Sequence, residues 1–196
     1  MGKNLLALAF LPALLAGQPA PAPAASFSPL DVGDKFEYRL GETFGITKII
    51  TVGVRAGYDQ LTDTPSEWKQ GGTAYAKRYV SEFGITVARQ TFAFTLESVL
   101  HEDPRYFPSG QKGFFARTKS ALKQAVITRT DSGRNRFATA KVGSALAAPF
   151  LANKWQPPST SDASTALSTF AITLAGDAGY NFLQEFFPRF RPKELR

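Results

Sequence analysis

Residues 73–100, with the sequence TAYAKRYVSEFGITVARQTFAFTLESVL, run without a proline through the middle of the chain. Apolar and small residues recur in this stretch every three or four positions, which is the spacing of one helix face. The expected buried stripe consists of Val80, Phe83, Gly84, Val87, Thr91, Phe94 and Thr95. A β-strand would alternate apolar and polar residues instead, so the stretch predicts a long helix.

A second helix is expected before this stretch, over residues 34–61. Asp34 and Glu37 have the spacing of a capping box, in which each side chain accepts a hydrogen bond from the backbone of the other. No proline interrupts the helix, and Gly41 and Gly45 are its candidate break points.

Three more helices are expected after residue 113. The first covers residues 114 to about 129, and the second covers 134–153, where Pro149 is expected to kink or end it. The third is capped by Asp162 and ends near Phe187. Its expected buried stripe consists of Leu167, Phe170, Ala171, Leu174, Ala178 and Phe182. The expected connections are residues 62–72, 101–113, 131–133 and 154–161.

These stretches predict an all-α fold, a helical bundle of about five helices with antiparallel neighbours. Small residues one turn apart favour close helix packing, and they occur at Gly41 and Gly45, Gly53 and Gly57, and Gly143 and Ala147. The competing architecture is an eight-stranded outer-membrane β-barrel, for which the chain length is suitable. Against it, alternation rarely lasts the roughly ten residues of a spanning strand. The alanine-rich run 138–152 is also poor strand material.

The amino terminus has the pattern of a secretory signal peptide. Lys3 precedes an uncharged apolar run, Leu5–Leu15, that is too short to span a bilayer comfortably. Cleavage after Ala24, in the small-residue sequence Ala22-Pro23-Ala24, leaves 172 of the 196 residues. Export then places the protein in the periplasm or cell envelope, and an uncleaved anchor is the alternative. The expected organisation is a signal peptide at 1–24, a flexible segment at 25–33, a helical domain at 34–187 and a tail at 188–196.

Composition removes many chemistries. The chain has no cysteine and one histidine, His101, which excludes disulfides, thiolate zinc sites, cysteine nucleophiles and multi-histidine metal centres. The sequence therefore predicts no cofactor and no metal site.

Positive charge is concentrated in one segment. Residues 104–141 contain nine basic residues and one acid, whereas the whole chain has a net charge of +7. The expected membrane- or anion-binding patch consists of Arg117, Lys119, Lys123, Arg129, Arg134 and Arg136. With Phe114 and Phe115, the helix from residue 114 has the composition of an interfacial helix on anionic lipid. The alternative is a core helix with a solvated basic face, and nucleic acid is not an expected partner.

Two polar clusters are candidate sites. His101, Glu102 and Asp103 could orient an imidazole as a general base, although no Gly-x-Ser-x-Gly nucleophile elbow accompanies them. The structural alternative has His101 at a helix C-terminus and pairs an acid with Arg105 or with basic residues of the next helix. Residues 128–136 could bind a phosphate or carboxylate, or they form a capped turn between helices.

Lys48, Arg55 and Asp59 share one face of a helix amid apolar neighbours. Asp177 interrupts another apolar stretch, and a buried charge without a partner costs several kcal/mol. If the bundle buries these groups, Asp177 is expected to pair with Arg55 or Lys48.

The words HEDPRYF at residues 101–107 and TRTDSG at 128–133, with Gly71-Gly72 and Lys77-Arg78-Tyr79 upstream, resemble an uncharacterised family of exported bacterial proteins. The resemblance covers roughly residues 34–187. It implies a small, mostly helical secreted or envelope protein, and it brings no activity, cofactor or catalytic residue.

The expected function is therefore that of a non-catalytic exported envelope protein. Its expected partner is an anionic lipid surface or another envelope protein. The alternative is a small hydrolase-like or anionic-ligand-binding domain that uses His101, Glu102 and Asp103.

Overall fold

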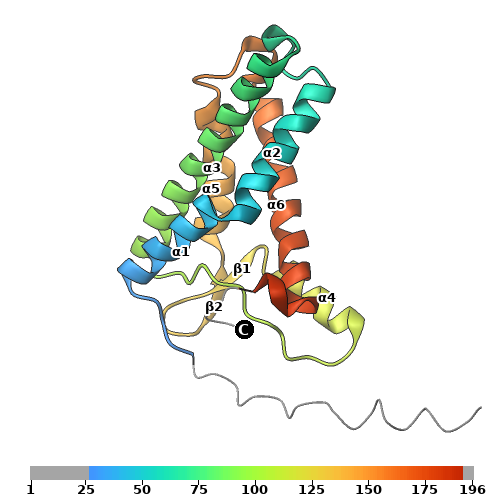
Figure 1. The fold of residues 1–196 in the computed structure, drawn as a ribbon. Coiled ribbons are helices and arrows are strands. Elements are labelled where there is room, and N and C mark those ends of the chain that lie inside the picture. The colour runs from blue at the N-terminus through green and yellow to red at the C-terminus, as the bar shows by residue number, and fades with distance from the viewer. Residues whose placement is uncertain (1–26, 192–196) are drawn as a thin grey trace, which may run out of the picture.

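The computed structural model describes residues 27–191, and helices make up most of this range (Figure 1). The six α-helices are α1 (Val32–Phe44), α2 (Ile46–Leu61), α3 (Gly72–Leu100), α4 (Phe114–Lys123), α5 (Thr139–Ala152) and α6 (Ala163–Phe186). Three short 3-10 helices are η1 (Ser66–Trp68), η2 (Pro158–Thr160) and η3 (Pro188–Phe190). The predicted all-α helical bundle is confirmed.

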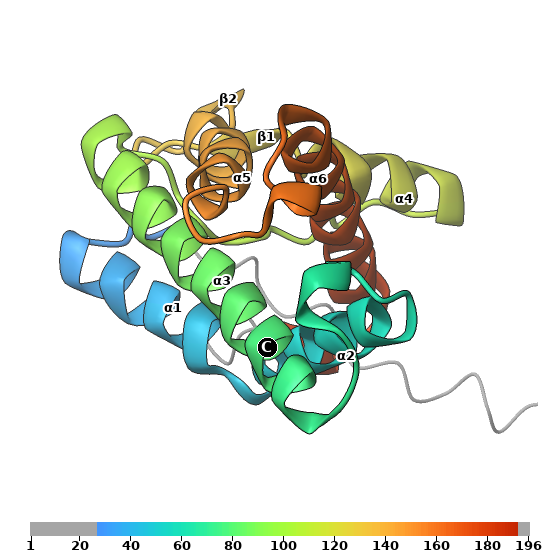
Figure 2. The same cartoon turned by 90° about the horizontal axis from the view of Figure 1, so that it is seen from above.

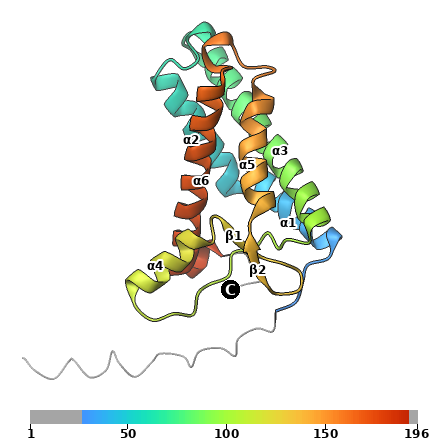
Figure 3. The same cartoon turned by 180° about the vertical axis from the view of Figure 1, so that it is seen from behind.

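Helix α3 is the central element of the bundle. It packs against α1 and α2 on one side and against α5 on the other (Figure 2). Helix α6 packs against α5, and α4 crosses the lower end of α6 (Figure 3). None of the helices in the described range is both long and apolar enough to cross a bilayer.

A β-hairpin follows α4, where the sequence predicts that the helix continues to Arg129. Strand β1 (Ile127–Arg129) pairs antiparallel with β2 (Asn135–Phe137). The predicted helix over 114–129 is therefore wrong beyond Lys123, and the helix predicted from residue 134 begins at Thr139. Branching at Cβ favours strand in this stretch, and Gly133 has a φ of 80°, which a tight turn requires and glycine adopts without strain.

The break between α1 and α2 is at Gly45, one of the two predicted positions. A Cβ atom added there would lie 2.5 Å from the carbonyl oxygen of Gly41. The capping box exists, but it joins Asp31 to Asp34 rather than Asp34 to Glu37. The helix therefore starts earlier than predicted because Asp31 is also a good N-cap residue.

Pro149 does not end α5, because the helix continues to Ala152. Asp162 caps α6 as predicted, since its carboxylate accepts hydrogen bonds from the backbone N–H groups of Ser164 and Thr165. The predicted signal peptide lies outside the described residues.

No member of the predicted stripes on α3 and α6 is fully buried; each is half-buried or exposed. On α3, Val80 is 69% exposed and Val87 is 38% exposed, while Arg78 and Glu97 are buried. On α6, Leu167 is 50% exposed, and the buried residues are Ala166, Asn181, Gln184 and Glu185. Apolar periodicity identified the helices correctly but did not identify their most buried positions.

Small residues fill the contact between α3 and α5. Ala93 on α3 and Ala140, Ala145 and Ala148 on α5 are buried. A Cβ atom on Gly143 would lie 3.4 Å from Leu96 Cδ1, so the Leu96 side chain of α3 packs against α5 at this glycine. Each alanine buries little apolar area. The largest fully buried side chains are charged or polar.

Candidate functional site

His101 ends α3 in the left-handed conformation, with φ 55° and ψ 42°. Its imidazole is 77% exposed, and Nδ1 lies 3.4 Å from Asp131 Oδ2. The histidine therefore faces Asp131 of the hairpin turn and does not join Glu102 and Asp103 in one site.

Glu102 is buried and caps the start of α5. Its two carboxylate oxygens accept hydrogen bonds from the backbone N–H groups of Thr139 at 3.1 Å and Ala140 at 2.9 Å. Ala138, the N-cap residue of α5, has no side-chain acceptor to offer. The negative charge of Glu102 also suits the positive end of the helix dipole.

Arg136 links the same carboxylate to the end of α3. Its Nε lies 3.4 Å from Glu102 Oε1, and its Nη1 donates a hydrogen bond to the carbonyl of Leu100 at 3.1 Å. We call Glu102 and Arg136 the interhelix cap pair, because each one satisfies backbone groups at a helix end distant in sequence.

Asp103 is buried and holds Arg105. Its carboxylate accepts hydrogen bonds from Arg105 N, Nε and Nη2 at 2.9, 2.9 and 2.6 Å. The hydrogen bond with Asp103 raises the pKa of Arg105. Arg105 also donates to the carbonyl of Ser28 at 2.7 Å. The structure thus contains the Asp103–Arg105 pair of the structural alternative, and both acids already accept hydrogen bonds from the protein's own donors.

Arg117 of the predicted basic patch faces inward, toward Glu185 on α6. The buried Glu185 carboxylate accepts hydrogen bonds from Tyr106 Oη at 2.6 Å, Ser109 Oγ at 2.6 Å and Arg117 Nε at 2.9 Å. Burial alone would raise the pKa of this acid, but hydrogen bonds from Ser109, Tyr106 and Arg117 outweigh burial and lower the pKa of Glu185 to about 2. Arg117 therefore has a structural role.

The hairpin carries three members of the predicted patch. Arg129 stacks over the Phe107 ring at 4.4 Å and lies 6.0 Å from that of Phe27. Arg134 is exposed, and its Nε donates to Ser132 Oγ at 3.3 Å. Arg136 belongs to the interhelix cap pair described above. Residues 128–136 therefore form a turn within a β-hairpin, not a turn between helices.

Lys119 and Lys123 project from α4 into solvent and make no hydrogen bond or ion pair to another described side chain. Aromatic and apolar residues surround them: Phe115 is 85%, Phe114 56% and Leu122 50% exposed. Phe114 also contacts the rings of Phe182 and Phe186 on α6.

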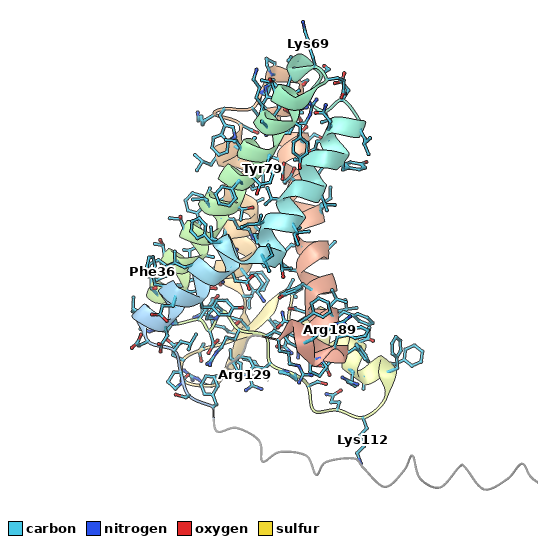
Figure 4. The ribbon with its side chains drawn as sticks, in the orientation of Figure 1. Phe36, Lys69, Tyr79, Lys112, Arg129 and Arg189 are labelled. Carbon is cyan, nitrogen blue, oxygen red and sulfur yellow. The ribbon has the colours of Figure 1, made fainter. Side chains whose placement is uncertain are left out.

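This end of the molecule also holds η3 and the loop before α4. Lys112 and Arg189 lie there, opposite to Lys69 at the far end of the bundle (Figure 4). Phe187 is 45% exposed, and Arg189 lies 5.2 Å from the Phe190 ring. We call α4, η3 and Lys112 the foot of the molecule. The foot combines exposed aromatic rings with cationic side chains.

Sequence reasoning missed the interior ion pairs of the bundle. Lys35 Nζ lies 2.8 Å from Asp131 Oδ2, and Arg39 pairs with Glu97 and with Gln90. Lys35 and Arg39 are four residues apart and share a helix face. That spacing was the available signal.

The predicted partner of Asp177 was wrong. Its carboxylate pairs with Arg89 Nη2 on α3 at 2.5 Å, while Arg55 lies 3.7 Å from Asp59 on its own helix.

Within residues 27–191, no three acidic or histidine side chains are grouped to hold a metal ion. No family model, curated protein or solved structure matches the chain.

Proposed function

We propose that the protein is a non-catalytic, exported component of the bacterial cell envelope that binds an anionic membrane surface through the foot. The observation that supports this proposal most directly is the exposure of Phe114, Phe115 and Leu122 beside Lys119 and Lys123. The side chains of Phe114, Phe115 and Leu122 can insert into the headgroup region of a membrane, while the ammonium groups of Lys119 and Lys123 remain among the lipid phosphates.

The expected binding free energy favours a reversible association of the protein with the membrane. Each basic residue near an anionic surface contributes about 1 kcal/mol, and burial of apolar area adds about 25 cal/mol per Å². The signal-peptide pattern and the resemblance to exported proteins support an envelope location. The first described residue, Phe27, packs on Phe107 near the foot, so the chain enters the bundle at this end.

The alternative function has less support. A hydrolase-like or anion-binding domain would need free groups on Glu102 and Asp103. Both carboxylates are buried and accept hydrogen bonds from the protein itself. The imidazole of His101 lies beside Asp131 but is 77% exposed, and no Gly-x-Ser-x-Gly nucleophile elbow accompanies it in the sequence.

The test is cosedimentation of the full chain with vesicles of phosphatidylcholine, with and without phosphatidylglycerol. We expect binding only when phosphatidylglycerol is present, and weaker binding as salt rises. The double variant Lys119→Glu/Lys123→Glu reverses two charges in the foot and should weaken binding at least about tenfold.

Lys77→Glu/Lys154→Glu is the matched control, since both lysines are exposed and lie away from the foot. It should change the vesicle affinity less than about twofold. Equal binding by the two double variants would contradict the proposal. If the native chain does not bind anionic vesicles, the membrane proposal is wrong, and a protein partner becomes the remaining interpretation.

A further inference from the structure

A cleft of about 980 Å³ is lined by residues of α1, α2, α3 and α6, and by Lys141 and Ser144 of α5. This volume is at the upper end of the range for small-molecule sites. Neither His101 nor any residue of the predicted patch lines the cleft.

Two of the cations along the cleft are neutralised by the protein. Arg39 pairs with the buried Glu97, and Arg89 pairs with Asp177. These pairs leave little net charge of their own.

Lys48 and Lys141 also line the cleft, and neither has an acidic partner in contact among the described residues. Lys48 makes no side-chain hydrogen bond in this range, and Glu42 attracts it only from beyond contact distance. Lys141 donates to one backbone carbonyl, that of Gln124, at 3.0 Å. Both ammonium groups interact electrostatically with the same acid, Asp177, so they face one region of the cleft.

Burial lowers the pKa of Lys48 and of Lys141, because each ammonium group has lost part of its water. A bound anion would restore the lost stabilisation. Two further acids, Glu42 and Glu82, line the cleft. Burial raises the pKa of Glu82 and favours its neutral form, so Glu82 opposes a bound anion less than an exposed acid would.

The walls of the cleft are otherwise largely apolar. Helix α2 contributes Ile46 and Val52, α3 contributes Ile85, and α6 contributes Ile172 and Leu183. An apolar wall beside two cations without acidic partners fits a ligand with an anionic head and an alkyl tail.

We propose that the cleft binds an anionic single-chain amphiphile, with its head between Lys48 and Lys141 and its tail along α2 and α6. The head is a carboxylate or a phosphate monoester. Phe190 of η3 lines the cleft, so the cleft borders the foot, but neither Lys48 nor Lys141 belongs to the foot. The proposed ligand site does not depend on the membrane-surface role.

The test is isothermal titration calorimetry of the full chain with decanoate and with decyl phosphate, each below its micelle concentration. We expect saturable binding of one stoichiometric equivalent, and the stronger of the two ligands identifies the head group. Decyltrimethylammonium, with the same tail and the opposite charge, should bind at least tenfold more weakly, and acetate should not bind measurably.

The variant Lys48→Met/Lys141→Met removes both charges and keeps the apolar stems, and it should lose at least tenfold in affinity. Lys119→Met/Lys123→Met is the matched control in the foot and should change the affinity less than twofold. If circular dichroism shows that the cleft double variant is unfolded, Lys48→Met alone is the replacement, with an expected loss of at least threefold.

Three results would overturn the proposal. The first is the absence of saturable binding by both decyl anions. The second is equal affinity for decyltrimethylammonium. The third is native affinity in a folded cleft variant. Because the foot variants report on vesicles and the cleft variants on monomeric amphiphile, failure of one proposal is distinguishable from failure of the other.

Discussion

Single charged side chains organise the interior of this protein. Glu102 supplies acceptors to α5, Asp103 fixes Arg105, and Glu185 gathers three donors around the start of α4. A buried charge is costly without partners, so removing one member leaves the others unsatisfied. The residue scale is therefore where the stability of the bundle is most sensitive to substitution.

The substitution Glu102→Ala should lower the free energy of unfolding by about 2 kcal/mol, because it leaves the first N–H groups of α5 without acceptors. Urea denaturation followed by circular dichroism measures the loss. His101→Asn is the neighbouring control, since the imidazole is exposed and asparagine tolerates the left-handed backbone. The control should change stability by less than about 0.5 kcal/mol. Equal effects of the two variants would mean that Glu102 does not cap α5.

Glu185 gives a pH dependence with a definite sign. Its pKa is lowered to about 2 from the ordinary glutamate value of 4.5, so the folded state binds this proton less readily than the unfolded state. The contribution is complete above about pH 4.5 and is lost as the pH falls toward 2.

Urea denaturation of the native chain and of Glu185→Gln, repeated between neutral pH and about pH 2, tests this dependence. The variant should be less stable at neutral pH, and its stability should fall less steeply below pH 4.5. Glu37→Gln removes an exposed carboxylate and should keep the native profile. Parallel profiles for the native chain and Glu185→Gln would refute the assignment.

At the scale of helices and strands, the sequence predicted where the helices lie better than it predicted which of their residues are buried. Prolines and glycines mark the connections, and this local signal located all the long helices. The hairpin was missed because the stretch from residue 124 onward contains no proline or glycine until Gly133. The most buried positions were missed because alanine and charged residues, rather than large apolar ones, occupy the contact between helices.

Paired substitutions on α3 test which of its positions are buried. Arg78 is buried and donates to the carbonyls of Thr64, Pro65 and Lys69, so it closes the connection between α2 and α3. Arg78→Met should lower the free energy of unfolding by at least about 2 kcal/mol, because those carbonyls lose their donor. Val80→Ala should cost less than about 0.5 kcal/mol in water, since Val80 is 69% exposed. Chemical denaturation measures both losses. A larger loss of unfolding free energy for Val80→Ala than for Arg78→Met would mean that the predicted stripe is the buried face of α3.

The sequence also located the candidate site better than it predicted the contacts made there. The sequence identified residues 101–105 as special, and the structure places them at a junction of α3, α5 and the hairpin. The pairing of Asp103 with Arg105, two residues away, was one of the alternatives that the sequence offered. The partners of His101 and Glu102, at positions 131 and 136–140, are 30 or more residues away. Their roles could not be inferred from the local sequence, because they depend on contacts that only the folded chain creates.

At the scale of the whole molecule, the outer surface is unusually apolar. The exposed residues include Ile46 at 71%, Val54 at 68% and Leu61 at 88% on α2, and Phe36 and Phe44 on α1. A monomeric protein seldom presents so many large apolar groups to water. Such a surface gains free energy when lipid, detergent or another protein covers it.

The purified chain should therefore self-associate reversibly in dilute buffer as its concentration rises. A mild non-ionic detergent above its micelle concentration should return it to a protein monomer. Sedimentation velocity at several protein concentrations, with and without detergent, gives the answer. Ile50→Lys/Val54→Lys on α2 should weaken the association, whereas Lys77→Glu/Lys154→Glu should not. A strictly monomeric native chain in buffer would contradict this expectation.

The interhelix cap pair has a consequence for how the bundle forms. Glu102 completes the start of α5, and Arg136 completes the end of α3, so neither helix end is satisfied while the other is undocked. The two ends and the hairpin between them should form and open as a single cooperative unit. A local fluctuation that frees one helix end also frees the other. We therefore expect the end of α3, the hairpin and the start of α5 to exchange their amide hydrogens together.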